Sequence, residues 1–199
     1  MEDIFTTIYE KNIWGNNKNN NYSGSSGSGS SISYNKKYIE ILKRILKGYK
    51  INSIVDLGCG DFRIGKLLYD DIDILYTGYD AYKKVIDFNQ SEYPQPKYTF
   101  EHLDFYKHKE SIKDGELCIL KDVIQHWSNK EIYSFLDYLI QSNKFKYILI
   151  INCCNQKKDE QDCETGGGRP LSCNFYPLKK YNPIKIENYK NKEVSIIKL

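Results

Sequence analysis

The strongest constraint on the fold is a short apolar segment that runs into an acidic residue and two closely spaced glycines. Residues 51–57 (INSIVDL) are mostly apolar, residues 58–62 (GCGDF) follow, and a helical pattern covers residues 63–69. Glycines at such a turn let the backbone approach a ligand closely. Open α/β sheets bind their ligands beyond the carboxyl ends of their strands. The sequence therefore predicts an α/β fold with a ligand site at this turn.

Further apolar segments alternate with helical patterns along the chain. Strands that alternate with helices predict a parallel sheet with right-handed crossovers. The last two segments, from Pro183 on, predict a closing hairpin. The sequence therefore predicts a doubly wound, mostly parallel, seven-stranded Rossmann-like sheet with an antiparallel last strand. The expected strands cover residues 51–57, 75–79, 98–103, 117–120, 147–151, 184–186 and 194–199.

Two of the expected helices have clear signals at their ends. An apolar face from Tyr38 to Tyr49 repeats at helical spacing, and Gly48 is the expected stop signal. Ser128 and Glu131 form the pattern of a capping box, which predicts that a helix begins there.

The length of 199 residues fits one domain, with a segment of different composition before it. Residues 15–31 are rich in Gly, Ser and Asn, which is typical of a linker, yet Phe5 and Trp14 precede them. We therefore expect residues 1–34 to form an N-terminal lid or linker and residues 35–199 to form the folded domain.

Composition argues against several classes of protein. The N-terminus lacks the basic start and apolar run of a secretory signal, and no apolar stretch approaches the length of a membrane span. A net charge of +3 is too small to require nucleic acid. We expect a cytoplasmic protein whose six cysteines are reduced. A zinc site among the four late cysteines is disfavoured, because they form no CxxC pair.

Acidic residues at three expected strand ends indicate the nature of the ligand. A dinucleotide is disfavoured, because the third glycine of a GxGxxG fingerprint would fall on Arg63. Asp56 suits the cationic groups of S-adenosylmethionine, whose carboxylate the amides of the turn would bind. Asp80 is expected to accept hydrogen bonds from the ribose hydroxyls, and Asp104 from the adenine amino group. The alternative is a set of solvated acids at strand ends.

Over residues 35–155 the chain resembles the class I S-adenosylmethionine-dependent methyltransferases. The matching segments, which agree with the family pattern in order and spacing, are residues 55–62, 79–80, 103–104 and 120–126. The third, looser glycine of the family motif falls on Phe62, which leaves the conformation of the loop open.

The chain also resembles a narrower group of small methyltransferases, several of which are linked to sugar modification. The shared features are Trp14-Gly15, the SGxGS pattern of residues 26–30 and the GGxRPL pattern of residues 167–171.

The resemblance implies S-adenosylmethionine as the cofactor, with S-adenosylhomocysteine as its product, and residues 35–199 as the methyltransferase domain. It places Phe105 against the adenine ring and Trp14 over the cofactor. The residues expected at the cofactor are Trp14, Asp56, Gly58, Cys59, Gly60, Asp61, Phe62, Asp80, Ala81, Asp104, Phe105 and Lys121.

Methyl transfer to oxygen requires a positioned acceptor and benefits from a base. His126 is the candidate base, and Asp122 at the same strand end is a further catalytic candidate. The alternative for His126 is a structural histidine that holds the turn. Arg169 follows three glycines and is expected to clamp an acidic or phosphate-bearing acceptor, unless it is a solvated loop residue. Asn152 is expected to reach the same crevice.

A divalent cation is possible at this strand end but is not favoured. Some relatives with a Glu-x-x-Glu-His pattern bind Mg²⁺ here, and this chain has Asp122, Gln125 and His126 instead. The amide replaces one of the acids, so no metal site is predicted.

The leading functional interpretation is O-methylation of a small molecule or a glycan hydroxyl. Enzymes that methylate exocyclic amines often carry an Asn-Pro-Pro-Tyr-like run after the fourth strand, where this chain has Lys121-Asp122-Val123. One alternative is an RNA methyltransferase that contacts phosphates through its tail lysines, although nucleic acid is disfavoured as a partner. A second alternative is a non-catalytic module that binds S-adenosylmethionine and regulates a partner. The tail lysines are Lys179, Lys180, Lys185, Lys190 and Lys192.

Overall fold

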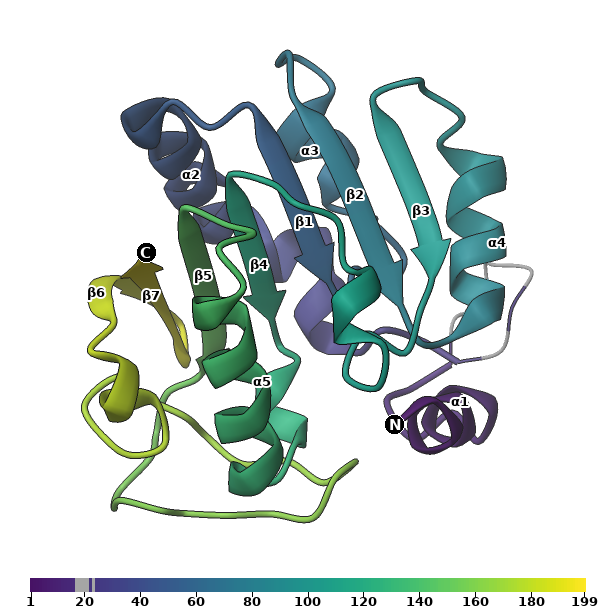
Figure 1. Cartoon of the computed structure of the whole chain (residues 1–199). Helices are drawn as coiled ribbons and strands as arrows, with labels where there is room; N and C mark the ends of the chain where they lie inside the picture. The colour runs from purple at the N-terminus through teal and green to yellow at the C-terminus, as the bar shows by residue number, and fades with distance from the viewer. Residues whose placement is uncertain (17–21, 23) are drawn as a thin grey trace.

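In the computed structural model, which describes residues 1–16, 22 and 24–199, seven strands form one sheet in the order β3-β2-β1-β4-β5-β7-β6 (Figure 1). Strands β1 to β5 are parallel to one another, and β7 runs antiparallel to both β5 and β6. This arrangement confirms the doubly wound, mostly parallel sheet with an antiparallel last strand. The strands are β1 (Ser53–Leu57), β2 (Leu75–Asp80), β3 (Tyr98–His102), β4 (Leu117–Lys121), β5 (Tyr147–Cys153), β6 (Ile184–Tyr189) and β7 (Lys192–Lys198).

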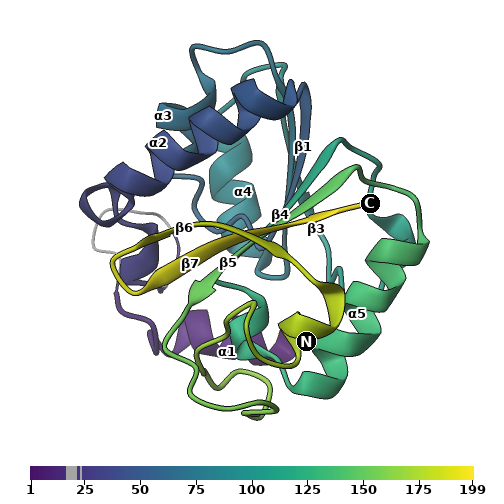
Figure 2. The same cartoon turned by 90° about the vertical axis from the view of Figure 1, so that its left-hand side faces the viewer.

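Helices cover both faces of the sheet, as Figure 2 shows from the side. The side chains of β1 alternate between the two faces, because successive residues of a strand point in opposite directions. Ile54 packs with α2, α3 and α4, whereas Val55 and Leu57 pack with α5. The helices are α1 (Glu2–Glu10), α2 (Ile32–Tyr49), α3 (Gly65–Tyr69), α4 (Lys83–Glu92) and α5 (Asn129–Gln141).

The ends of the two predicted helices agree with the sequence signals in one case and differ in the other. Ser128 caps α5 through a complete capping box with Glu131, which confirms that prediction. Gly48 was expected to stop α2 but lies inside it. The helix instead ends at Tyr49, and Lys50 adopts the left-handed cap conformation with φ of 54°. Gly48 therefore lies near the end of the helix, as expected, but Lys50 and not Gly48 adopts the left-handed cap conformation.

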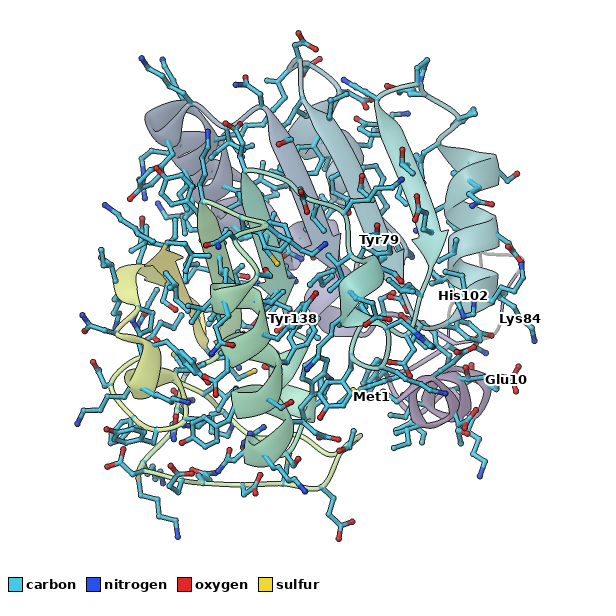
Figure 3. All side chains as sticks on the ribbon, in the orientation of Figure 1. Met1, Glu10, Tyr79, Lys84, His102 and Tyr138 are labelled. Atoms are coloured by element: carbon cyan, nitrogen blue, oxygen red, sulfur yellow. The ribbon has the colours of Figure 1, made fainter. Side chains whose placement is uncertain are left out.

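Helix α1 lies across the carboxyl edge of the sheet, close to the ends of β2 and β3 (Figure 1). An ion pair between Glu10 and Lys84 at 2.8 Å attaches it to the domain (Figure 3). The Glu2 carboxylate also lies 3.0 Å from Nε2 of His102. The predicted domain boundary at residue 35 falls inside α2. The division into a separate N-terminal segment and a folded domain stays a prediction, and part of the expected linker (residues 17–21 and 23) lies outside the described residues.

Two further findings concern the whole described chain. All six cysteines are free thiols, and Cys118 is buried in β4. No helix within the described ranges combines the length and the apolar character needed to cross a membrane.

Candidate cofactor-binding site

A pocket of about 130 Å³ opens at the carboxyl edge of the sheet, where β1 and β4 lie side by side. Ligands of open α/β sheets bind at such a point, because the strand order reverses there and leaves a crevice. The turns that follow β1, β2, β3 and β4 all contribute residues to its lining. The structure therefore brings together the residues that the sequence predicted at the cofactor, from Trp14 to Lys121.

The glycine loop after β1 is fixed by backbone contacts. The carbonyl of Tyr79 accepts hydrogen bonds from the amides of Gly58 and Cys59, and Asn89 of α4 donates to the carbonyl of Gly60 at 2.7 Å. A Cβ atom on Gly58 would lie only 2.5 Å from Val123, so the close approach of the turn after β4 requires glycine.

Phe62 stands where the family motif has its third glycine, and its backbone adopts a left-handed conformation that favours glycine. Its φ of 50° is in the left-handed region, which costs a non-glycine residue about 1–2 kcal/mol. Its buried ring packs against the rings of Tyr76, Tyr98 and Phe100. The distances between ring centroids are 4.7, 4.9 and 4.9 Å, respectively. Burial of an aromatic ring offsets that cost. Phe62 therefore keeps the loop conformation while its side chain belongs to the core.

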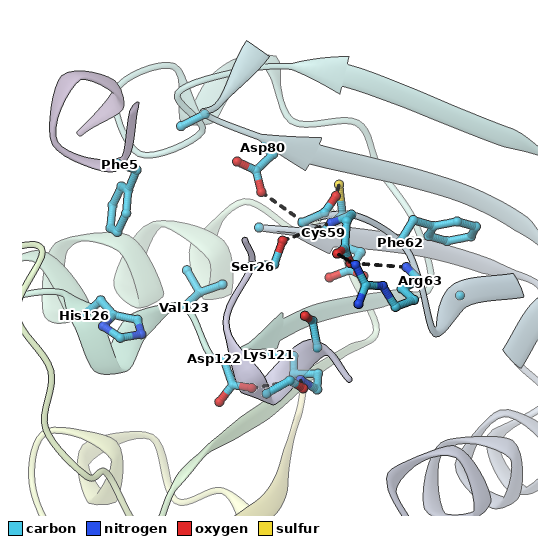
Figure 4. A pocket seen from close by; sticks show the side chains of 18 of the residues that line it. Phe5, Ser26, Cys59, Phe62, Arg63, Asp80, Lys121, Asp122, Val123 and His126 are labelled. Carbon is cyan, nitrogen blue, oxygen red and sulfur yellow. Dashed lines mark hydrogen bonds and ion pairs between the residues drawn. The ribbon is translucent and has the colours of Figure 1, made fainter. Parts of the chain in front are cut away.

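Asp80 follows the same loop from the end of β2. One carboxylate oxygen accepts a hydrogen bond from the amide of Gly60 at 3.0 Å (Figure 4). The other accepts one from the amide of Tyr82, also at 3.0 Å. Burial raises the pKa of Asp80, and these amides oppose the rise. Each carboxylate oxygen retains a second lone pair, so Asp80 can still accept hydrogen bonds from ligand hydroxyls.

Asp56 and Asp61 are the other acids of the β1 turn. Burial raises the pKa of Asp56 to about 6, against the opposing effects of the Tyr76 hydroxyl at 2.8 Å and of Lys121. Burial also raises the pKa of Asp61, whose carboxylate pairs with Arg63 at 3.0 Å. At pH 7 Asp56 is therefore mostly ionised, and a cationic group that binds beside it would stabilise its charge further.

Asp104 and Phe105 lie on the adenine side of the predicted site. The Asp104 carboxylate accepts hydrogen bonds from the ammonium of Met1 at 2.9 Å and the amide of Glu2 at 3.0 Å. Burial would raise the pKa of Asp104, but the Met1 ammonium and neighbouring amides hold it below its usual value. Phe105 packs against Trp127 at 5.9 Å and lines the pocket with Ala81.

The N-terminal segment forms one wall of the pocket. Trp14 contacts the rings of Phe5, Tyr9 and His126, at centroid distances of 5.9, 5.8 and 4.9 Å. Ser26 lies on the glycine loop and accepts a hydrogen bond from the Asp61 amide at 3.2 Å. The sequence placed Trp14 here and singled out Ser26 as part of the SGxGS pattern, but it gave Tyr9 no role at the cofactor.

The turn after β4 carries a charged cluster. Asp122 has φ of 61° and pairs with Lys121 at 2.8 Å and with the buried Lys192 of β7. Burial would raise the pKa of Asp122, but the two ammonium groups lower it. Asp122 is therefore a stable anion and a weak base. From the sequence, Lys192 was one of the tail lysines. The pairing of β7 with β5 brings it next to Asp122.

His126 lies at the opposite end of the pocket from Arg63 (Figure 4). Its Nδ1 is 2.6 Å from the carbonyl of Gly167, and its Nε2 is 3.2 Å from the amide nitrogen of Gln125. A carbonyl only accepts, so this network assigns the ring proton to Nδ1 and leaves the lone pair on Nε2. Burial lowers the pKa of His126, so the imidazole is neutral at pH 7.

Arg169 and Asn152 lie away from the pocket lining. Arg169 is buried, and its guanidinium donates to the carbonyls of Gln161 and Gln125 and to the side chain of Asn129. These bonds hold the glycine-rich loop against the turn after β4. Asn152 is buried on β5, and neither of its side-chain polar atoms has a partner among the described residues.

Several other residues singled out by the sequence have structural partners. Lys180 pairs with Asp137 at 2.8 Å and Lys185 lies 3.5 Å from Glu193, whereas Lys192 is buried. Over the described part of the chain, no group of three acidic, histidine or cysteine side chains is arranged to hold a metal ion.

No protein-family model matches this chain, and no curated protein sequence is significantly similar to it. Solved structures do match. The methyltransferase domain of bacterial CtHen1-C is 14% identical with a TM-score of 0.64, over 83% of this chain and 98% of that domain. This chain has the class I methyltransferase fold.

Two other structures with this methyltransferase fold hold the cofactor or its product. Magnesium protoporphyrin IX methyltransferase from Synechocystis PCC 6803, with bound S-adenosylhomocysteine, is 11% identical with a TM-score of 0.64 over 98% of both chains. Human N-acetylserotonin methyltransferase, in complex with S-adenosylmethionine, is 14% identical with a TM-score of 0.59, over 81% of this chain and 55% of that one. At these identities the likeness shows the fold.

Proposed function

We propose that this chain is an S-adenosylmethionine-dependent methyltransferase that acts on a hydroxyl group of a small molecule or a glycan. The main support for the proposal is that the glycine loop, Asp56 and Asp80 line the same pocket, at the crevice between β1 and β4. The methyltransferase fold of the solved structures supports it.

The residues of the pocket fit the groups of this cofactor. Asp80 would accept the ribose hydroxyls, since each of its oxygens has a free lone pair beside its bond to a backbone amide. Asp56 would face the cationic amino-acid end, and Asp104 would accept the adenine amino group in exchange for the Met1 ammonium. When bound, S-adenosylmethionine supplies an electrophilic methyl group on its sulfonium.

The acceptor side of the pocket supplies a base. The neutral imidazole of His126 carries its lone pair on Nε2, where it accepts a hydrogen bond from the side-chain amide of Gln125. The acceptor hydroxyl would replace this amide at Nε2 and transfer its proton there. The Gly167 carbonyl, bonded to Nδ1, stabilises the imidazolium that forms. Asp122 keeps its charge between two lysines and acts on the electrostatics of the site, and Arg169 positions the turn through its backbone contacts.

The test is calorimetric titration of the full chain with S-adenosylmethionine and S-adenosylhomocysteine, followed by transfer of a labelled methyl group to sugars, glycans and RNA. Micromolar binding of both ligands and labelling of a hydroxyl-bearing acceptor are expected. Labelling of RNA alone would favour an RNA methyltransferase, and binding without any turnover would favour a regulatory module. A folded sample that binds neither ligand would contradict the proposal.

A further inference from the structure

Two hydroxyl groups from the N-terminal segment meet directly above the glycine loop. The hydroxyl oxygens of Tyr9 and Ser26 lie 2.9 Å apart, and Ser26 also accepts the hydrogen bond of the Asp61 amide. Ser26 packs so closely on the loop that a Cβ atom on Gly60 would lie 2.7 Å from its oxygen. Both hydroxyl residues line the pocket, and none of the sequence motifs assigns them to a ligand.

The hydroxyl pair has one proton more than its own contacts use. Each hydroxyl carries one proton, and one of the two is shared between Tyr9 and Ser26 whichever oxygen donates it. The Asp61 amide occupies a lone pair of Ser26 and uses no hydroxyl proton. Within the described residues no acceptor takes the second proton. Burial, and then the charge of Asp80, raise the pKa of Tyr9, so both hydroxyls are donors at neutral pH.

The segment that carries the pair is fixed before any ligand binds. Gly24 has φ of 85°, and a Cβ atom there would lie 2.3 Å from the carbonyl oxygen of Tyr9, so only glycine permits this packing. The carbonyl of Gly29 accepts hydrogen bonds from the buried Asn35 at 2.6 Å and from Lys121 at 2.9 Å. Preorganised donors of this kind bind a ligand without further ordering of the chain.

The polarity of the pair selects the group that it can bind. Acidic and basic side chains both lie at this end of the pocket, where Arg63 pairs with Asp61 at 3.0 Å and Lys121 pairs with Asp122 at 2.8 Å. Of the groups at the amino-acid end of S-adenosylmethionine, the amino group only donates hydrogen bonds. The carboxylate only accepts them, so it matches a spare hydroxyl donor.

We propose that the hydroxyl pair of Tyr9 and Ser26 binds the carboxylate at the amino-acid end of the cofactor. The inference rests on the proposed function and deepens it, because it assigns the N-terminal segment a direct contact with one chemical group of the ligand.

The test compares two ligands that differ only in that group. Calorimetry measures the affinity of the full chain for S-adenosylhomocysteine and for S-adenosyl-3-thiopropylamine, which lacks the carboxylate. Wild-type protein is expected to prefer the carboxylated ligand by about tenfold, the contribution of one charge-assisted hydrogen bond. Ser26→Ala is expected to reduce this preference to about twofold or less, mainly by weaker binding of S-adenosylhomocysteine.

Two further variants keep the test decisive. Ser26→Cys retains the packing on the loop with a weak donor, so it is expected to lose most of the preference even if Ser26→Ala fails to fold. Thr7→Val removes a hydroxyl from the exposed side of α1, where Thr7 bonds only to the Asp3 carbonyl, and is expected to leave both affinities unchanged.

Equal losses for both ligands in the Ser26 variants would show a structural role and overturn the inference. An unchanged preference would overturn it as well, while leaving the proposed function intact. If wild-type protein binds neither ligand, the proposed function itself fails.

Discussion

Asp80 and Asp122 stand at two strand ends of one sheet edge and line one pocket, yet their surroundings differ. Asp80 accepts two backbone amides and, in the described part of the chain, has no cationic partner within ion-pair distance. Asp122 lies between the ammonium groups of Lys121 and Lys192. Amides leave lone pairs of a carboxylate free for ligand hydroxyls, whereas two lysines compensate its charge. We therefore propose that the cofactor side binds through its acid and that the acceptor side works through His126.

The largest expected effect separates these two sides by removing the base. His126→Ala should lower kcat by about 1,000-fold, within the range typical of general bases, while the affinity for S-adenosylhomocysteine stays within about twofold of wild type. Methyl-transfer kinetics and calorimetry measure the two quantities. In wild type, kcat/KM should rise with pH below 6.5 and level off above it, because burial lowers the pKa of His126. A comparable kcat in the variant would assign His126 a structural role.

The next effect concerns Asp80. Asp80→Ala should weaken binding of S-adenosylhomocysteine by about 100-fold, because two charge-assisted hydrogen bonds to the ribose are lost. Asp87→Ala is the matched control, since Asp87 is an exposed acid on α4 that pairs only with Lys83 among the described residues. Calorimetric affinities of folded variants decide the point. Equal affinities in the two variants would contradict a role for Asp80 in ligand binding.

Lys192→Met tests whether the two lysines compensate the charge of Asp122. It leaves the partly buried Asp122 with only Lys121 and should lower the free energy of unfolding by about 2 kcal/mol, less than the loss for a fully broken buried pair. The exposed pair gives the control, because Lys83→Met should change stability by less than about 0.5 kcal/mol. Denaturant unfolding measures both. Adding Asp122→Asn should recover part of the loss, and no recovery would argue against the pairing.

The smallest expected effect is a pH dependence of binding. Burial raises the pKa of Asp56 to about 6, so this carboxyl is ionised at pH 7 and mostly neutral at pH 5. A cationic ligand prefers the ionised form, and the affinity for S-adenosylhomocysteine should therefore fall by about tenfold from pH 7 to about pH 5. Asp56→Asn should abolish this dependence. A variant with the same pH profile as wild type would show that another group titrates.

The cofactor side was largely predictable from the sequence, because its geometry is local. A strand, two glycines and an acid at the next strand end set the positions of Gly58, Gly60 and Asp80 through contacts between adjacent turns. Phe62 was unexpected as a left-handed residue, since its conformation depends on aromatic side chains from β2 and β3. The mostly parallel direction of the strands followed from the alternation of apolar segments with helical patterns, whereas their order in the sheet was not predicted.

The acceptor side was less predictable, because its contacts join distant parts of the chain. Lys192 reaches Asp122 only through the antiparallel pairing of β7 with β5. The tautomer of His126 is set by Gly167, on a loop far along the chain. Arg169 was expected at the acceptor, but its guanidinium is bonded to backbone carbonyls beneath the turn. Helix α1 lacked a strong signal, although Tyr9 lines the pocket.

A crystal structure of the full chain with S-adenosylhomocysteine is the most direct test of the proposed site. The adenosine is expected between the glycine loop and Asp104, with both ribose hydroxyls within hydrogen-bond distance of Asp80 and the sulfur facing the turn after β4. Asp104 should exchange its contact with the Met1 ammonium for one with the adenine amino group. Crystals grown at saturating ligand that show an empty crevice, or ligand density elsewhere, would contradict a cofactor site at this edge.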